Sequence, residues 1–247
     1  MNSQFLGLDF LSSDNLFLER LISPPGLKAT SVHFVAASTL VAASSNPELQ
    51  EILLSATVIA DSFPIRKYLS FYDKNFHGMR GSDFLKKVVS NDNTYSHLFI
   101  VPSEDSWRYF ERYLKNTDSG FRAINYLCPS NIDRNFDVRD WSETIRHCKP
   151  DFIWVCLGSP KQDFISSAIS LEFGITSIAI GAAFNFVSGY VKEAPLFLRI
   201  IGLEWLYRLF KEPKRLWRRY LFGNFQFLLL IYHDLIQRKR FMRYFNE

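Results

Sequence analysis

The 247-residue sequence predicts an α/β fold, in which helices cover both faces of a mainly parallel sheet and a helical appendage follows. Short runs of β-branched and aromatic residues alternate with longer segments of helical periodicity between residues 32 and 180. These short runs are also continuously apolar, as strands buried on both faces are. Alternation and two-sided burial together indicate a Rossmann-like architecture.

Six strands are expected along this stretch. The apolar runs that predict them are residues 32–37, 57–60, 97–101, 122–127, 152–157 and 176–180. Helical periodicity fills residues 46–56, 82–90, 104–116, 138–148 and 161–173, with Asn, Ser or acidic residues near their starts. Residues 23–26 and 129–137 read as loops because they are rich in turn-forming residues.

Charge divides the chain into two expected parts. Residues 192–247 hold 12 Lys/Arg against 5 Asp/Glu, a net charge of +7, whereas residues 1–191 hold 17 against 20, a net charge of −3. We therefore expect an α/β domain over residues 1–194 and a basic amphipathic helical appendage over residues 195–247. The most apolar stretch, residues 225–236, is shorter than the ~18 to 20 residues of a spanning helix and contains His233 and Asp234. It is predicted to form a buried or interfacial helix.

The appendage mixes aromatic and cationic residues at helical spacing. Pro213 is expected to end one helix and begin another. The ordinary interpretation is a solvated basic face. Trp and Tyr beside Arg, and a second such cluster at residues 238–245, favour an anionic membrane surface instead. The arginine forks also suit diphosphate groups. The cations concerned are Arg208, Lys211, Arg215, Arg218 and Arg219.

Cysteine usage and ligand spacing exclude several classes of site. Three cysteines with no C-x-x-C spacing, and no signal peptide at the start, predict a reducing, cytoplasmic compartment without disulfides. No D-x-D element follows a strand, and the five histidines show no zinc spacing. The sequence therefore predicts neither a metal nor a cofactor.

Ligands of parallel sheets bind beyond the carboxyl ends of the strands. Asp61 and Ser62 follow the strand at 57–60, and the small residues 181–185 follow the strand at 176–180. Residues 158–162, "GSPKQ", place glycine and proline before a helix start, where backbone N–H groups and Lys161 suit a phosphate. The alternative is that Gly158 and Pro160 only form a tight turn.

Two of these segments carry a family resemblance. "PDFIWVCLGSPKQDFI" (150–165) and "GAAFNFVSGYVKEAPLFLRIIGLEWLYRLFKEPKRLWRRY" (181–220) resemble the WecG/TagA/CpsF glycosyltransferases, the second almost position for position over about forty residues. The match is looser earlier in the chain. Asp61 corresponds best to the family's strand-end aspartate, although an ungapped alignment places Ser62 there.

The chain also departs from the family pattern. In "RGSDF" (80–84) the glycine-x-aspartate element is present, but Gly78 stands where the family has an arginine. The family's Thr-x-Asn at the end of the first strand is absent from residues 33–38. Asn185 replaces an aspartate and Asp163 replaces a glutamate. These departures leave open a member that kept its fold and tail but lost efficient catalysis.

The resemblance implies inverting, metal-independent transfer of a sugar from a UDP-sugar to a polyprenyl-diphosphate-linked saccharide, as in bacterial surface polysaccharide synthesis. The implied donor sugar is N-acetylmannosamine, its uronic acid, glucose or glucuronic acid. The protein would work as a peripheral protein on the inner face of the cytoplasmic membrane. The sequence leaves open whether the protein forms a homo-oligomer. Nucleic-acid binding is the distant alternative, which the net negative domain and the lack of a recognised module disfavour.

The resemblance also assigns roles to residues. Asp61 would be the catalytic base, against the alternative that it caps the following helix. The residues expected to bind substrate are Ser62, Gly81, Asp83, Gly158, Pro160, Lys161, Gln162, Gly181, Phe184, Asn185, Arg208, Arg215, Arg218 and Arg219.

Overall fold

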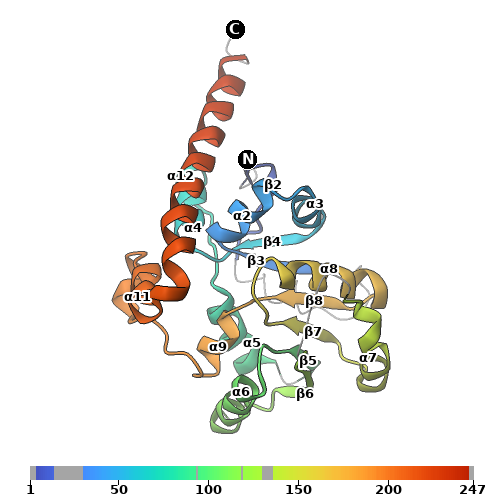
Figure 1. Ribbon diagram of the computed structural model, residues 1–247. Coiled ribbons are helices and arrows are strands. Elements are labelled where there is room, and N and C mark those ends of the chain that lie inside the picture. The colour runs from blue at the N-terminus through green and yellow to red at the C-terminus, as the bar shows by residue number, and fades with distance from the viewer. Residues whose placement is uncertain (1–3, 14–29, 93, 118, 130–135, 245–247) are drawn as a thin grey trace.

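Within residues 4–13, 30–92, 94–117, 119–129 and 136–244, which the computed structural model describes, the chain forms a six-stranded parallel sheet (Figure 1). Of the side chains in these ranges, those of residues 219 and 239–244 are not described. The strands are β3 (Ser31–Val35), β4 (Thr57–Ala60), β5 (Ser96–Ile100), β6 (Arg122–Leu127), β7 (Phe152–Val155) and β8 (Thr176–Ala179). Their order is β4-β3-β8-β7-β5-β6, and every neighbouring pair is parallel.

Helices cover both faces of the sheet, as the sequence predicts. All residues of β3, β5 and β7 are buried, so alternate side chains feed different cores. Phe99 belongs to a core shared with α5, α6 and α9, whereas Leu98 and Ile100 belong to one shared with α7 and α8. A third core joins the end of β3 to α2, α3 and α4.

The helices agree with the predicted order and add several elements to it. In chain order they are α2 (Ala37–Ser44), α3 (Pro47–Ser55), α4 (Phe63–Tyr72), α5 (Gly81–Asn91), α6 (Glu104–Thr117), the 3-10 turn η1 (Val138–Trp141), α7 (Ser142–Cys148), α8 (Lys161–Phe173), α9 (Ala183–Val187), α10 (Leu196–Ile200), α11 (Glu204–Lys211) and α12 (Pro213–Tyr244). A short hairpin of β1 (Gln4–Phe5) and β2 (Leu8–Asp9) precedes them.

The end of the first predicted strand is wrong. Instead of running to Ala37, β3 ends at Val35 and α2 starts at Ala37. Residues 37–44 are mostly alanine, serine and threonine with little periodicity, but alanine favours the helix. The hairpin β1–β2 and helix α4 were not predicted. The predicted loop at 23–26, and residues 130–135 of the loop at 129–137, lie outside the described residues.

Helix α11 ends at Lys211 and helix α12 begins at Pro213, the residue at which the sequence predicts the change from one helix to the next. The inner face of α12 packs on the body through Leu216 and Phe227, both buried. The Phe227 ring contacts Phe5 with centroids 5.9 Å apart. Asp234, also buried, accepts hydrogen bonds from the hydroxyl of Tyr68 (2.5 Å) and the backbone N–H of Leu6 (3.2 Å). These contacts fix the helix to the N-terminal hairpin and α4, and its last turns project beyond the body (Figure 1).

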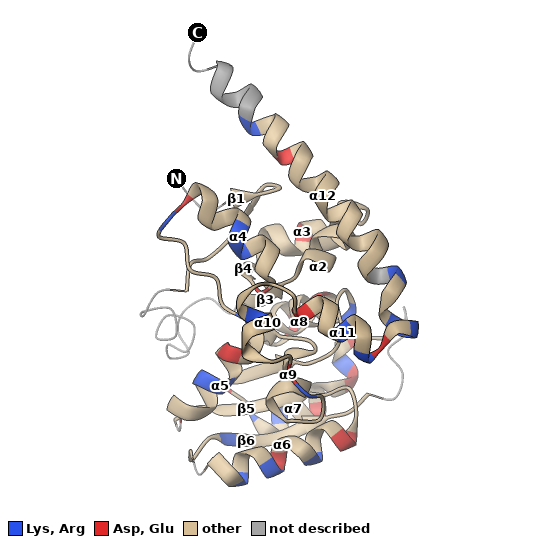
Figure 2. Cartoon of the chain, turned by 90° about the vertical axis from the view of Figure 1, so that its left-hand side faces the viewer, with Lys and Arg blue, Asp and Glu red and all other residues tan. Residues whose placement is uncertain are grey.

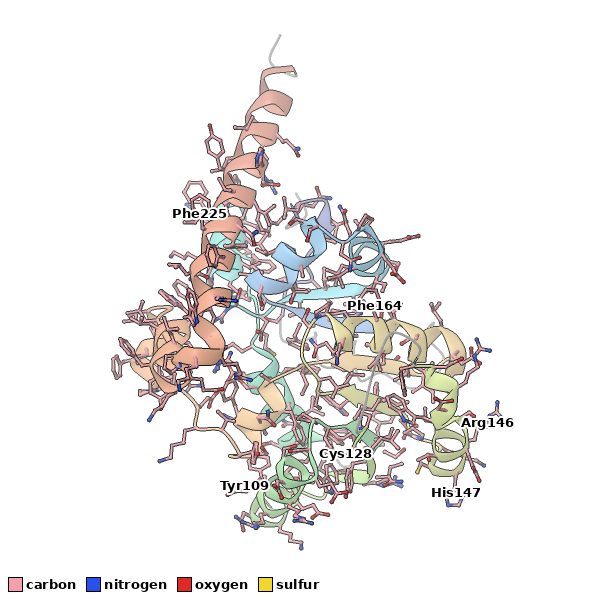
Figure 3. The ribbon with its side chains drawn as sticks, in the orientation of Figure 1. Tyr109, Cys128, Arg146, His147, Phe164 and Phe225 are labelled. Atoms are coloured by element: carbon pink, nitrogen blue, oxygen red, sulfur yellow. The ribbon has the colours of Figure 1, made fainter. Side chains whose placement is uncertain are left out.

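The outer face of α12 is apolar and exposed. It forms one stripe at steps of three and four residues, composed of Trp217 (43% exposed), Leu221 (66%), Phe225 (62%), Leu228 (62%) and Tyr232 (60%). Figure 3 shows Phe225 pointing away from the body. Basic residues gather instead where α11 meets α12, and most of α12 beyond that junction is uncharged (Figure 2). Within the described part of the chain, none of the helices combines the length and apolarity needed to cross a membrane.

Candidate active site

A pocket of about 240 Å³ lies at the carboxyl ends of β3, β4 and β8. The helices that follow β3 and β8 pack on opposite faces of the sheet, α2 near α8 and α9 against α5. A crevice opens where neighbouring strands send their connections to opposite faces, and ligands of α/β sheets bind there. Trp205 from α11, and Tyr220 and Asn224 from α12, form the outer wall. The pocket is therefore built from both the sheet and the appendage.

Asp61 lies on the floor of this pocket, directly after β4. Its Oδ1 accepts a 2.7 Å hydrogen bond from the backbone N–H of Gly81, the first residue of α5. Asp61 does not cap the helix that follows it. The cap position of α4 belongs to Ser62, whose hydroxyl accepts a hydrogen bond from Ala37 N–H at 3.1 Å. The carboxylate of Asp61 is thus held by α5 while it faces the pocket.

The surroundings of Asp61 make its carboxylate a stronger base. Burial raises the pKa of Asp61, outweighing the Gly81 hydrogen bond and the charges of Arg80 and Arg66, which lower it. Glu204 also acts to raise the pKa. A carboxylate that holds a proton more readily is better suited to take one from a hydroxyl group.

Among the described side chains, four arginines line the pocket: Arg66, Arg80, Arg199 and Arg208. Arg208 stacks over the Phe186 ring at 5.2 Å, and Arg199 forms an ion pair with Glu193 at 3.1 Å. Such a set of cations favours an anionic ligand, because planar guanidinium groups match phosphate oxygens.

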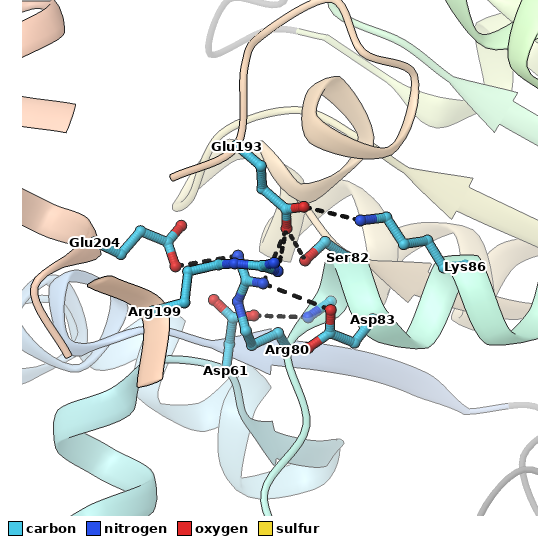
Figure 4. Close-up of polar contacts among 9 residues, drawn as sticks. Asp61, Arg80, Ser82, Asp83, Lys86, Glu193, Arg199 and Glu204 are labelled. Carbon is cyan, nitrogen blue, oxygen red and sulfur yellow. Dashed lines mark hydrogen bonds and ion pairs between the residues drawn. The ribbon is translucent and has the colours of Figure 1, made fainter. Parts of the chain in front are cut away.

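The buried side chain of Arg80 is the centre of an ion-pair network with partly exposed carboxylates, which we call the Arg80 clamp. Its guanidinium forms ion pairs with Glu193 (2.9 Å) and Glu204 (3.1 Å), and a longer one with Asp83 (3.5 Å) (Figure 4). Burial disfavours the Glu193 carboxylate, but the Lys86 hydrogen bond and the Arg80 charge outweigh it and lower the pKa of Glu193. The clamp joins the start of α5 to α11, which carries part of the outer wall.

The segment after β7 supplies the opposite side of the pocket. Gln162 is buried, and its Oε1 has no hydrogen-bond partner among the described residues. Gly181 has a positive φ of 56°, and a Cβ there would lie 2.8 Å from Gln162 Oε1. Glycine is therefore required for the backbone and the amide to come together. The amide is left as an acceptor for a ligand hydroxyl.

Asp163, which stands where the family pattern has a glutamate, does not line the pocket. It is buried beneath the pocket, where one oxygen lies 2.8 Å from His33 Nδ1 and the other accepts a 2.6 Å hydrogen bond from the hydroxyl of Ser159. Ser159 itself lines the pocket. The effect of Asp163 on a ligand is thus indirect, through the position of Ser159.

The structure brings together part of the predicted site. Gly81 and Asp83 lie in the first turn of α5, and Pro160 and Lys161 lie exposed at the start of α8. Phe184 is fully buried against Phe99 and Phe110, beneath the pocket. The predicted residues that line the pocket are Asp61, Ser62, Gly158, Gln162, Gly181 and Arg208.

The other predicted residues lie outside this lining. Asn185 has a buried Oδ1 without a hydrogen-bond partner among the described residues. Arg215 pairs with Glu212 at 2.6 Å, and Arg218 stacks over Trp217 at 5.1 Å. The side chain of Arg219 is outside the described residues.

Several pocket residues were not predicted. Arg80 and Glu204 stand within segments that match the family pattern, so the motifs themselves were the available signal. Arg199 also stands within the matching segment 181–220. Arg66 had no such signal, because only the fold brings α4 to this pocket.

A second, more open groove of about 660 Å³ runs between α2 and α12 and shares Ser38, Ser159 and Gly223 with the pocket. Apolar side chains of α12, including Phe222 and Leu229, line it together with Arg218. The groove and the pocket therefore adjoin at these three residues. Among the described residues, no three His, Cys, Asp or Glu side chains are grouped as a metal site would require.

Comparison with known proteins gives a consistent picture. The family model described as the glycosyl transferase WecG/TagA/CpsF family matches residues 6–241. An N-acetylglucosaminyldiphosphoundecaprenol N-acetyl-beta-D-mannosaminyltransferase of Bacillus spizizenii is 38% identical over 86 residues, which are 34% of this chain and 33% of that protein. The enzyme of the same description from Bacillus subtilis is 40% identical over 81 residues, 32% of this chain and 31% of that protein. The chain thus matches about a third of the length of these curated relatives.

Proposed function

Because the chain belongs to the WecG/TagA/CpsF family of glycosyltransferases, we propose that it transfers a sugar from a UDP-sugar to a polyprenyl-diphosphate-linked saccharide, with Asp61 as the base. The observation that carries the proposal is the placement of Asp61. A partly buried carboxylate with a raised pKa faces a pocket lined by four arginines, at the point of the sheet where ligands bind.

The proposed reaction is a single displacement with inversion. Asp61 takes the proton of the acceptor hydroxyl while that oxygen attacks the anomeric carbon. The bond from this carbon to the diphosphate oxygen breaks, and UDP leaves with the bonding electrons. The arginines of the pocket balance the charge that develops on the diphosphate, a role that a metal ion fills in other transferases. Asp61 uses Oδ1 for the Gly81 hydrogen bond, so Oδ2 is the oxygen that receives the proton.

The names of the relatives favour one donor among the four that the resemblance implies. Both act on N-acetylglucosaminyldiphosphoundecaprenol and transfer N-acetylmannosamine, so we propose UDP-N-acetylmannosamine and this acceptor as the first pair. The absence of Thr-x-Asn has a local consequence in the pocket. The wall at this end of β3 is formed by Ala36, Ala37 and Ser38. It therefore offers fewer polar groups to the donor than Thr-x-Asn would.

The acceptor stays in a membrane, so the enzyme must work at its surface. We propose that α12 lies along an anionic membrane surface, with its exposed apolar stripe toward the acyl chains and the arginines at the α11–α12 junction toward the headgroups. An exposed apolar stripe of this length is uncommon on a soluble protein. Together with flanking Arg and Trp it is typical of interfacial helices. This arrangement places residues 195–247 at the membrane and residues 1–194 above it, on the cytoplasmic side.

The activity can be tested with a panel of UDP-sugars and a short-chain polyprenyl-diphosphate-linked N-acetylglucosamine, with products identified by mass. We expect one UDP-sugar to add a single hexose unit and release UDP, with activity retained in EDTA. If no sugar in the panel is transferred to this acceptor or to other lipid-linked saccharides, the catalytic proposal is wrong. The protein is then better described as a family member that kept its fold and tail but lost efficient catalysis.

A further inference from the structure

Among the described residues, the side chains of two pocket arginines, Arg66 and Arg208, donate no hydrogen bond and form no ion pair, and Arg208 instead stacks over the Phe186 ring. Arg80 gives its donors to the clamp, and Arg199 shares Glu193 with it. Among the described residues, the side chain of Arg66 takes part in no hydrogen bond or ion pair, and its Nε is buried without a partner. A buried guanidinium nitrogen that no protein group satisfies is costly unless a ligand completes it.

Gly78 makes the room for this arginine. A Cβ at position 78 would lie 2.4 Å from Cγ and 2.7 Å from Cδ of Arg66. The backbone of Gly78 does not have a positive φ, so the glycine is needed for space and not for a turn. The stem of Arg66 therefore occupies the volume that any side chain at position 78 would enter.

This volume lies at a position where the family pattern has a side chain that this chain lacks. The family pattern has an arginine three residues before Gly81, where this chain has Gly78. We propose that Arg66 binds the diphosphate of a substrate, and that it supplies from α4 the guanidinium that the family pattern places at position 78. The inference rests on the proposed function, since it concerns the same pocket.

The chemistry of the site suits a diphosphate. An arginine fork makes two parallel hydrogen bonds to phosphate oxygens, and these are strengthened where water is excluded. Burial lowers the pKa of Arg66, but an arginine keeps its charge at any working pH. Asp61 lies close enough to attract it. A diphosphate bound by Arg66 is therefore held beside the base.

Two substrates carry a diphosphate: the UDP of the donor and the polyprenyl diphosphate of the acceptor. Isothermal calorimetry with UDP, and separately with a short-chain polyprenyl-diphosphate-linked N-acetylglucosamine, distinguishes them. Arg66→Ala should weaken binding of one of the two ligands by about ten- to a hundredfold, which is the loss of affinity expected when a hydrogen bond to a charged group is removed. Arg66→Gln, which keeps the bulk, should show a similar loss. Arg139→Ala, at an exposed arginine of η1, is the control and should bind like the parent.

Two further variants test the exchange of positions. Gly78→Ala changes no charge but forces Arg66 aside, so it should weaken the same ligand. The double variant Arg66→Ala/Gly78→Arg removes the obstructing stem and should recover most of the lost affinity. Thermal melting checks that each variant is folded.

Each failure has its own meaning. If Arg66→Ala and Arg66→Gln bind both ligands like the parent, Arg66 is not a diphosphate residue. A double variant as weak as Arg66→Ala would overturn the exchange between positions 66 and 78. A parent that binds neither ligand would refute the proposed function, and this inference with it.

Discussion

Asp61 shows how the surroundings of a single residue set its chemistry. Free aspartate is a weak base at neutral pH, but burial raises the pKa of Asp61. The backbone N–H of Gly81 holds its carboxylate in place. The same burial makes its charge unfavourable for folding. Function and stability are therefore opposed at this position, and a substitution can separate them.

Asp61→Asn should reduce kcat by at least about 100-fold, because the amide cannot accept a proton. It should not lower the melting temperature at pH 7.5. A raised pKa means that the ionised carboxylate destabilises the folded state above that pKa, and asparagine keeps an oxygen for Gly81 N–H. Ser62→Ala is the comparison, because an ungapped alignment assigns the family's aspartate to Ser62. Loss of activity in Ser62→Ala with a normal Asp61→Asn would transfer the role of base.

The pH profile of kcat/KM should have an acid limb set by Asp61. Activity is lost as pH falls through the folded pKa, which lies above the ordinary value of 3.8 because burial outweighs the opposing charges of Arg80 and Arg66. Glu204, on the facing element, adds to the rise. The midpoint is read from initial rates in buffers of constant ionic strength. An identical acid limb in the residual activity of Asp61→Asn would assign it to another group.

Sequence motifs could reveal some of these residues and not others. Asp61, Gln162 and Gly181 follow predicted strands, so the rule for parallel sheets finds them. Arg66 lies on α4, which was not predicted. Its importance depends on Gly78, twelve residues away, and this dependence exists only in the folded chain.

At the scale of elements, the strands were predictable and the small helices were not. Strands buried on both faces need continuous apolar runs, and these are visible in the sequence. Helix α2 has no such signature, because its alanine, serine and threonine residues are compatible with several structures. The outer wall of the pocket required the fold, since ion pairs between α5 and α11 join residues 80 and 204.

The Arg80 clamp should contribute strongly to stability. Arg80→Gln leaves Glu193 and Glu204 without their shared partner, and breaking a buried ion pair costs about 3 kcal/mol. The melting temperature should fall by roughly 6 to 12 °C for a chain of this size. Arg108→Gln is a matched control, because Arg108 also pairs with two carboxylates but is exposed; its effect should be below about 1 kcal/mol. Equal melting temperatures for the two variants would mean that the clamp is not stabilising.

At the scale of the whole molecule, α12 presents two apolar faces with different partners. The inner one, with Leu216 and Phe227, is buried in the body, and the outer stripe has no partner in the monomer among the described residues. A membrane and a second copy of the chain are the two surfaces that could cover it.

The outer stripe should control membrane binding. Leu221→Glu/Phe225→Glu places two charges in the stripe and should abolish sedimentation with vesicles containing anionic lipid, without unfolding the protein. Leu171→Glu is the control, because Leu171 is 84% exposed on α8, outside the stripe. Reversal of Arg215, Arg218 and Arg219 to glutamate should weaken the salt-sensitive part of binding at low salt.

Two results would contradict the membrane assignment. If the stripe variant binds vesicles like the parent, the stripe does not contact lipid. If the parent is a stable dimer in sedimentation velocity and the stripe variant is a monomer, the stripe is an interface between two copies.

The position of Tyr220 and Asn224 on α12, next in sequence to members of the exposed stripe, has a consequence for how the substrate arrives. One helix, about 10 Å across, separates the exposed stripe from the pocket wall. If the stripe contacts a membrane, as we propose, an acceptor anchored in the leaflet would reach Asp61 by sideways diffusion in two dimensions, without leaving the bilayer. The encounter rate would then depend on the number of acceptors per area of membrane. Lowering the fraction of acceptor lipid in each vesicle should therefore slow the reaction more than lowering the concentration of vesicles.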